Sequence, residues 1–565
     1  MLVALSNIQN NSVNRTQTEI QQRYIPRYGA TDSVSFSGGK IGLKQIGLGK
    51  FSKYAKFENY APEVRNFLEY KIPVHNSELN SYMNNHYSSK TFNNLFDFAD
   101  KKGVFDFQVD HKTGFVKTSV IGSGEDVTMA DTIWVTDTCR NMSLLKKKHP
   151  ELCTKALNNL SKFYVKQQPE FEKIIEKPEL FKNNLNWFTR IGGAHAFDPK
   201  TLEANQIFIK SRLESIGLFL QTASDLIVDG LVKGANYGYK DAHHVGGDSK
   251  DAIANCVKYL KAIDYPNAPS CGAWEEKTFK HSLTSDTSII NEGLRKVFKL
   301  MYAKTNNKEL LQLRAEIFNS KHGDVFADKK ELSDLIKKGE KRVIKNHNEE
   351  APEERELDAA LCFVTHSGKL SNKGVIEDVF ENMKVLEKIE ILVGDNGIAR
   401  YQKDKYKNHD YDLRPKGFAL KLTKILAPKN LEKQNHEAQW FMVSDIAKGY
   451  GTQIKKITDS ITKENRFVSG AEESILRKLL AKETEYINRS YARISGENSF
   501  KANGKPCSAY KVPEAIQAVT DNKRGGVKYV IGTNTPLAWA QASLLDASSL
   551  YAENLATLEK LGINI

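Results

Sequence analysis

Residues 270–276, with the sequence SCGAWEE, contain the most informative feature of the chain: Trp274 is followed directly by two acids, Glu275 and Glu276. Cleavage of a glycosidic bond passes through an oxocarbenium-like state, which needs a protonated carboxyl group at the leaving oxygen and a second carboxylate to activate water. A neighbouring aromatic ring offers a sugar an apolar face, and by excluding water it raises the pKa of the acid. The same stretch is also typical of a helix start whose acids interact with the helix dipole. The rest of the sequence has to distinguish the two interpretations.

The composition of the whole chain is that of a folded, water-soluble protein. The chain has 565 residues, of which 40% are hydrophobic, 27% charged and 10% aromatic. This length allows about three or four domains, or one large helical barrel. The formal net charge is +13, but the lysines are dispersed among acids in amphipathic segments. Since no recognised nucleic-acid-binding module accompanies the charge, we expect no nucleic acid partner.

The six cysteines are spread along the chain without a Cys-x-x-Cys pair or a nearby histidine pair. They predict neither a zinc site nor a disulfide framework, and we expect no cofactor. The apolar run at the N-terminus has no basic residues before it, and no run of about 18 apolar residues follows. We therefore expect a cytoplasmic protein that does not bind a membrane. The sequence leaves the oligomeric state open.

The N-terminal part of the sequence differs from the rest. Residues 1–90 are rich in Asn, Ser, Tyr and Lys and show no persistent helical period, which predicts an irregular extension before a domain spanning 91–565. The glycines between positions 38 and 49 match neither of the phosphate-binding patterns Gly-x-Gly-x-x-Gly and Gly-x-x-x-x-Gly-Lys-Ser/Thr. Alternating apolar residues in 103–109 and 114–120 predict a short β-hairpin within the domain.

Helical patterns dominate from about residue 131. In 214–230, for example, apolar residues recur at helical spacing. Similar stripes occur in the ranges 251–263, 285–302, 355–365, 375–391, 437–462, 471–486 and 535–561. About ten to twelve helices of this kind are compatible with an α/α toroid and with a helical solenoid. Periodicity alone leaves both architectures open.

Four of the five tryptophans lie in short blocks. The blocks are IWVTD at 133–137, GAWEE at 272–276, QWF at 439–441 and TPLAWAQ at 535–541, with GIARYQKDKY at 397–406 between them. In this order they resemble the glucoamylase-like proteins of glycoside hydrolase family 15 and the related barrel of the phosphorylase kinase α and β subunits. The resemblance covers roughly residues 131–565. It implies a mainly α (α/α)6 barrel, or six-hairpin toroid, that releases glucose from the non-reducing ends of α-glucans with inversion.

The resemblance also implies roles for individual residues. Glu275, the first acid after the tryptophan, matches the general acid, and Glu514, in KVPEA at 511–515, matches the general base. An inverting enzyme holds the two carboxyl groups about 6.5 to 9.5 Å apart, with room for a water molecule. The implied substrate-binding residues are Trp134, Asp137, Glu214, Trp274, Glu276, Arg400, Trp440 and Trp539.

These residues also have plainer interpretations. A tryptophan at helical spacing is often a core residue, and Arg400 could simply form a buried ion pair with Asp404. The sequence also departs from the family pattern: Thr136 stands where the family usually has arginine, and Glu214 replaces the aspartate of a Gln-x-Asp block. A non-catalytic glucan-binding or regulatory barrel therefore remains an alternative, and a helical scaffold without a sugar site is a third.

Overall fold

The structure is a computed structural model. It describes residues 63–67, 70–119, 132–183, 195–204, 212–274, 279–367, 369–402, 404, 437–521 and 526–563. The chain divides into a unit of residues 1–56 and a unit of residues 57–565, and all the described residues lie in the second. Every helix described is too short or too polar to cross a membrane.

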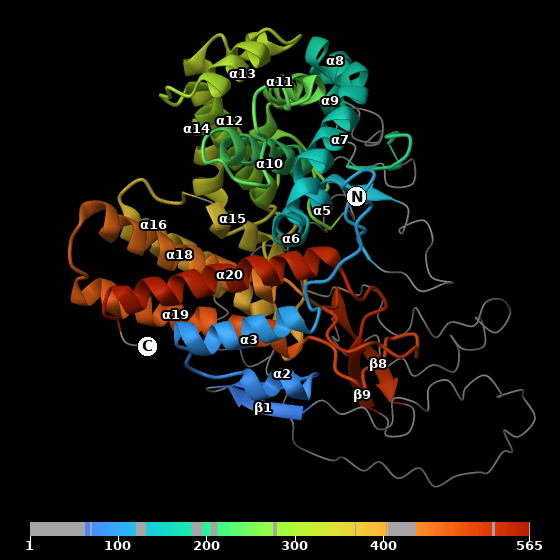
Figure 1. Ribbon diagram of the computed structural model, residues 1–565, viewed down its shortest axis with the longest axis vertical. Helices are drawn as coiled ribbons and strands as arrows, with labels where there is room; N and C mark the ends of the chain where they lie inside the picture. Colours follow the sequence, from blue (N-terminus) through green and yellow to red (C-terminus); the bar gives the residue numbers. More distant parts are fainter. Residues whose placement is uncertain are drawn as a thin grey trace, which may run out of the picture. The chain divides into compact units, whose positions relative to one another are not determined.

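Six helices form a closed inner ring, and all six are labelled in Figure 1. They are α5 (Val135–Arg140), α10 (Leu213–Leu231), α12 (Thr284–Tyr302), α15 (Cys362–Ser367), α18 (Val443–Glu464) and α20 (Ala538–Lys560). Each packs against the next in chain order, and α20 returns to contact α5 and the helix that continues it, α6 (Met142–Lys148). A solenoid would leave its first and last helices unpaired. The contact between α20 and α5 therefore identifies a toroid.

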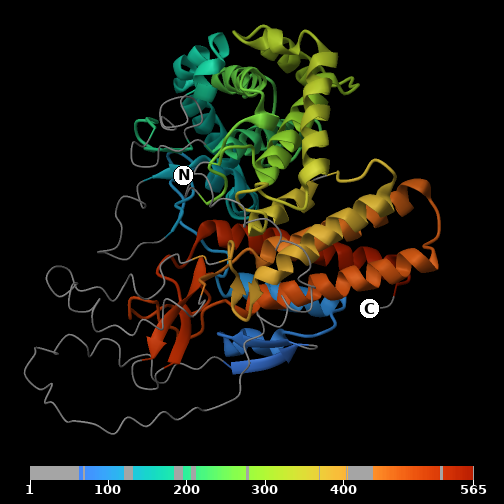
Figure 2. The same cartoon turned by 180° about the vertical axis from the view of Figure 1, so that it is seen from behind.

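A second layer of helices packs outside this ring. It consists of α7 (Cys153–Lys166), α11 (Gly247–Ala262), α14 (Lys329–Asn346), α16 (Val375–Ile389), α19 (Gly470–Ala492) and α3 (Ser89–Lys101). Five of these helices alternate with the inner ones along the chain, whereas α3 precedes the ring and packs on α20. Figures 1 and 2 show α18, α19 and α20, in orange to red, side by side with α3, in blue. The predicted (α/α)6 barrel is confirmed.

The remaining elements are short. The described residues also form the helices α2 (Ser77–Tyr82), α8 (Gln168–Glu176), α9 (Glu179–Asn183) and α13 (Lys308–Phe318). Strands β1 (Glu63–Phe67) and β2 (Tyr70–Val74) pair with each other, as do β3 (Ile133–Trp134) and β4 (Ala196–Phe197). An antiparallel sheet runs in the order β5 (Val393–Gly394), β6 (Gly397–Ile398), β7 (Gln439–Trp440), β8 (Ala515–Asp521), β9 (Gly526–Ile531).

Three predicted segments differ from the structure. Part of the extension predicted as irregular, 1–90, forms β1, β2, α2 and the start of α3, so its description as irregular is corrected for these residues. The predicted hairpin at 103–120 is a turn closed by one antiparallel bridge between Val109 and Val116. The helix predicted for 355–365 begins later, because Asp358 is extended and its side chain accepts a hydrogen bond from Ala360 N at 2.8 Å, which starts a 3-10 turn.

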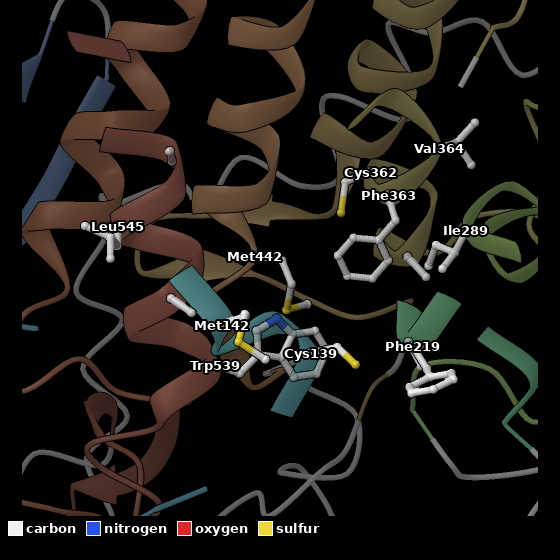
Figure 3. Close-up of a cluster of buried hydrophobic side chains, with 14 of the residues drawn as sticks. Cys139, Met142, Phe219, Ile289, Cys362, Phe363, Val364, Met442, Trp539 and Leu545 are labelled. Atoms are coloured by element: carbon white, nitrogen blue, oxygen red, sulfur yellow. The ribbon is translucent and has the colours of Figure 1, made fainter. Parts of the chain in front are cut away.

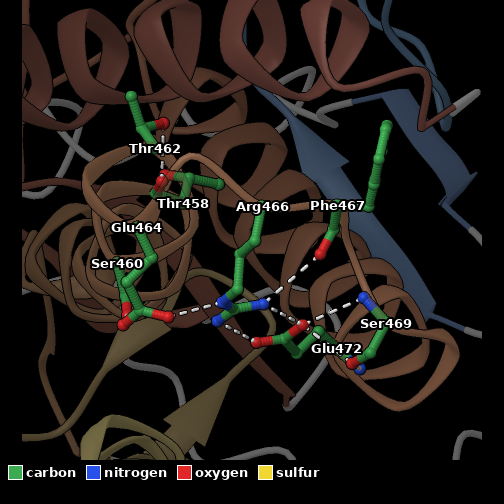
Figure 4. A network of polar contacts seen from close by, with 8 residues as sticks. All are labelled: Thr458, Ser460, Thr462, Glu464, Arg466, Phe467, Ser469 and Glu472. Atoms are coloured by element: carbon green, nitrogen blue, oxygen red, sulfur yellow. Dashed lines mark hydrogen bonds and ion pairs between the residues drawn. The ribbon is translucent and has the colours of Figure 1, made fainter.

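Local signals explain where the long helices begin and end. The turn between α18 and α19 is an example (Figure 4). Ser469 caps α19 by accepting from Glu472 N, and Glu472 accepts from Ser469 N at 3.0 Å, which is a capping box. Arg466 donates to Glu472 and to Glu464, the last residue of α18. This network ties the two helices of one hairpin together at their connection.

Candidate active site

Five of the predicted site residues lie at or beside the first turns of inner helices. Trp134 and Asp137 are at the start of α5, Glu214 is the second residue of α10, Trp440 directly precedes the turn into α18, and Trp539 is the second residue of α20. In a ring of parallel inner helices such positions converge at one end of the barrel. The fold thus brings together blocks that are hundreds of residues apart in the sequence.

Two tryptophans and an ion pair form the centre of this group. The rings of Trp274 and Trp440 have centroids 6.3 Å apart and are tilted by 42°. The Arg400 guanidinium lies 4.4 Å from the Trp440 ring centroid and donates to both carboxylate oxygens of Asp404, at 2.7 and 2.8 Å. Trp440 Nε1 donates to the same carboxylate at 3.1 Å. Asp404 therefore fixes both the guanidinium and the indole.

Main-chain hydrogen bonds and strand pairing connect the segment of Glu514 to Trp440 and Phe441. Its carbonyl oxygen accepts from Phe441 N at 3.1 Å, and the next residue, Ala515, pairs with Trp440 between β8 and β7. Its side chain is half-buried and accepts from Asn534 Nδ2 at 2.8 Å. The strand pairing thus places Glu514, whose side chain is partly accessible, directly beside the strand of Trp440.

Glu275 and Glu276 lie outside the described residues. The chain leading to them is anchored at Trp274, whose Nε1 donates to Asp358 Oδ1 at 2.7 Å. Just before it, Gly272 has φ +65, a conformation that favours glycine, and its N–H donates to Ser270 Oγ at 3.3 Å. The structure therefore shows where the segment containing the two acids begins.

The other predicted binding residues are buried. Asp137 lies next to the fully buried Thr136, whose hydroxyl is 3.4 Å from the Asp137 carboxylate. Glu214 accepts from Arg212 Nε at 2.7 Å. Trp134, Arg400, Trp440 and Trp539 are also buried. Among the described members of the predicted site, Trp274 and Glu514 are the two that are partly exposed.

The sequence interpretation did not include three buried acids, Asp358, Glu350 and Asp286. Asp358, the acceptor of the Trp274 indole, also accepts from Arg355 at 3.2 Å. Burial, together with the charge of Asp358, raises the pKa of Glu350 to about 8. Burial and the charge of Glu214 raise the pKa of Asp286 well above its ordinary value. Residues 349–358 are rich in Glu and Asp and resemble a solvated loop, so composition gave no signal that two of these acids are buried.

The chain is similar to several solved structures. A wild-type glycosidase matches with a TM-score of 0.49 and 12% identity, over 84% of this chain and 100% of that one. The glucoamylase from Saccharomycopsis fibuligera matches with a TM-score of 0.49 and 13% identity, over 89% and 99% of the two chains. The glucoamylase of Hormoconis resinae has a TM-score of 0.47 at 11% identity, over 82% and 74%. No family model and no curated protein matches the sequence.

Proposed function

We propose that this protein is an inverting glycoside hydrolase that releases glucose from the non-reducing ends of α-glucans or malto- and isomalto-oligosaccharides. The observation that carries the proposal is the arrangement around Trp440. On one side its ring lies against Trp274, the residue before Glu275, and on the other its strand pairs with the residue after Glu514. Two acids that are far apart in the sequence thus belong to segments that meet at one tryptophan.

In the proposed reaction the two carboxyl groups have different tasks. Glu275, in its protonated form, donates a proton to the oxygen of the bond that breaks, while Glu514 takes a proton from the water that attacks the opposite face of the sugar. The partial exposure of Glu514 suits contact with water, and the indole beside Glu275 suits an acid that must stay protonated. The product leaves with the opposite anomeric configuration.

The remaining residues would bind the sugar. The half-exposed Trp274 offers an apolar surface for a sugar ring. Arg400, Asp137 and Glu214 supply the charged donors and acceptors that hydroxyl groups require. Trp440 and Asp404 hold the guanidinium in place, so the interpretation of Arg400 as an ion-pair partner and its role toward a sugar are compatible.

The first experiment measures glucose release from maltose, isomaltose and starch. We expect Glu275→Gln to lower kcat by about 100-fold or more while oligosaccharide binding changes little. Replacing the carboxyl group by an amide removes the proton that would be transferred and preserves the shape of the side chain. Glu276→Gln is the matched control, and we expect it to retain more than about a tenth of the activity.

Two outcomes would contradict the proposal. Unchanged turnover by the Glu275→Gln variant would exclude this residue as the acid. Saturable oligosaccharide binding by the wild-type chain without any glucose release would instead support the non-catalytic barrel. The anomer formed first, followed by NMR, tests the mechanism: β-glucose is expected from an α-linked substrate, and α-glucose would rule out inversion.

A further inference from the structure

A cavity of about 310 Å³ lies among the inner helices, and none of the predicted site residues line it. Its walls come from all the inner helices. In α10 the wall begins at Leu218, one turn beyond Glu214, and in α20 it begins at Ser543, one turn beyond Trp539. The cavity therefore lies deeper along the inner helices than the candidate active site.

A packed layer lies between the cavity and the helix starts. The Arg140 guanidinium stacks 4.1 Å from the ring centroid of Phe363 and 4.7 Å from that of Trp539. Trp539 also contacts Phe441, with centroids 5.1 Å apart. Figure 3 shows Trp539 and Phe363 in the interior between the inner helices, with Met142 beside the indole. Arg140 and Phe363 line the cavity whereas Trp539 does not, so the layer forms one of its ends.

The fixed charges of the cavity wall compensate one another. Three cations (Arg140, Lys146, Lys448) and three carboxylates (Asp225, Asp445, Asp546) line it. Lys448 is paired with Asp546 at 2.7 Å, and Asp225 with Lys296 at 2.8 Å. Two further titratable residues line the wall. Burial holds the pKa of His366 well below its usual range and raises the pKa of the Cys139 thiol, so both are neutral at pH 7. A charged ligand would add a charge that this balanced wall does not compensate, whereas a neutral ligand would not.

Two wall residues carry a buried polar atom that has no hydrogen-bond partner among the described residues. Asp445 is 2% exposed, and its Oδ2 has no hydrogen-bond partner among the described residues. The Nε of Arg140 likewise has none within the described part of the chain. Gln221, Thr222 and Ser543 add amide and hydroxyl groups to the same wall. A buried polar atom without a partner is costly, so this pair favours a ligand or water that both accepts and donates.

We propose that this cavity is a binding site for a neutral polyhydroxylated molecule of the size of one sugar ring. Neighbouring hydroxyl groups of such a molecule can donate to Asp445 and accept from Arg140 at the same time. A volume of about 310 Å³ is at the lower end of small-molecule sites, which suits a single ring and excludes a chain. This site is distinct from the candidate active site and does not depend on hydrolysis.

The test uses the full chain, with D-glucose and myo-inositol as probes and inorganic phosphate as a charged comparison, measured by calorimetry and ligand-observed NMR. The variant Trp274→Ala removes the surface of the candidate active site, so the remaining binding reports on the cavity. In that background we expect Thr222→Trp, which fills the cavity, and Asp445→Asn, which removes the acceptor, to weaken binding of at least one of the two neutral probes by about tenfold or more. Thr222→Val, of nearly the same volume, is the control and should change the Kd less than about threefold.

The result can overturn the proposal in three ways. Absence of saturable binding of both neutral probes in the Trp274→Ala variant would mean that the cavity holds only water. Binding that Thr222→Trp and Asp445→Asn both leave unchanged would place the probe elsewhere. Inorganic phosphate that binds more tightly than either neutral probe would assign an anion site instead. A protein that binds D-glucose in the cavity but hydrolyses no glucan would contradict the proposed function alone.

Discussion

Asp404 is the residue on which the geometry around Trp440 depends most. It is fully buried, and its two oxygens accept from Arg400 and from the Trp440 indole. We expect Asp404→Ala to lower the free energy of unfolding by about 3–5 kcal/mol, because it removes the carboxylate that accepts two hydrogen bonds from the buried Arg400 guanidinium. Urea denaturation followed by tryptophan fluorescence measures this change.

The control for this prediction removes both charges. The double variant Arg400→Met and Asp404→Leu removes both charges of this ion pair, so we expect a smaller loss of stability than in Asp404→Ala alone. A single-variant cost below about 1 kcal/mol would show that water reaches the guanidinium. The sequence allowed two interpretations of Arg400, as an ion-pair partner and as a sugar-binding residue. The structure shows the buried ion pair with Asp404.

Among the described helices, α10 and α12 form the most extensive contact, and two glycines allow their backbones to approach closely. A Cβ atom added to Gly217 would lie 2.6 Å from Ile290 Cα, and one added to Gly293 would lie 2.4 Å from Gly217 O. Both obstacles are backbone atoms, so the helices themselves would have to separate. We expect Gly217→Ala to destabilise the barrel by about 1–3 kcal/mol, measured by thermal and urea unfolding.

A second glycine serves as the comparison. Gly470 begins α19, and among the described residues no atom beyond its chain neighbours and its own helix backbone lies within 4 Å of an added Cβ. Because alanine favours a helix more than glycine does, Gly470→Ala should leave stability unchanged or raise it by up to about 1 kcal/mol. Equal effects of the two substitutions would contradict the close approach of α10 and α12.

At the scale of the whole molecule, a buried acid makes stability depend on pH. Glu350 accepts from Ser285 N at 3.1 Å at the start of α12 and lies in the segment that leads to α15, so it joins two neighbours of the inner ring. Its pKa is raised from 4.5 to about 8. The folded state therefore binds this proton more tightly than the unfolded state, and the stabilisation present below about pH 4.5 is lost as the pH rises through 8.

Urea unfolding of the wild-type chain and of Glu350→Gln tests this dependence. We expect the difference in stability between pH 6 and pH 8.5 to shrink in the variant, since glutamine stays neutral throughout. A variant that retains the full decrease would assign it to other groups. A wild-type chain whose stability rises over this range would contradict the direction of the shift.

Periodicity largely predicted the helices of the barrel, whereas their closed arrangement was predicted only through the order of the tryptophan blocks. The stripe predicted in 214–230 corresponds to α10, and those in 285–302 and 535–561 correspond to α12 and α20. The closing contact between α20 and α5, and the position of α3 in the outer layer, had no signal in periodicity. The two acids of the pair Glu275 and Glu276 remain sequence predictions, since they lie outside the described residues.

The sequence by itself determined where helices form, because apolar spacing and caps act between residues a few positions apart. It also singled out the tryptophan blocks and Glu514. Only the tertiary structure decided that the helices close into a ring, that Trp274 is partly exposed while Trp440 is buried, and that the segment of Glu350 and Asp358 turns inward. Those features depend on contacts between residues far apart along the chain, whose free energy exists only once the barrel has closed.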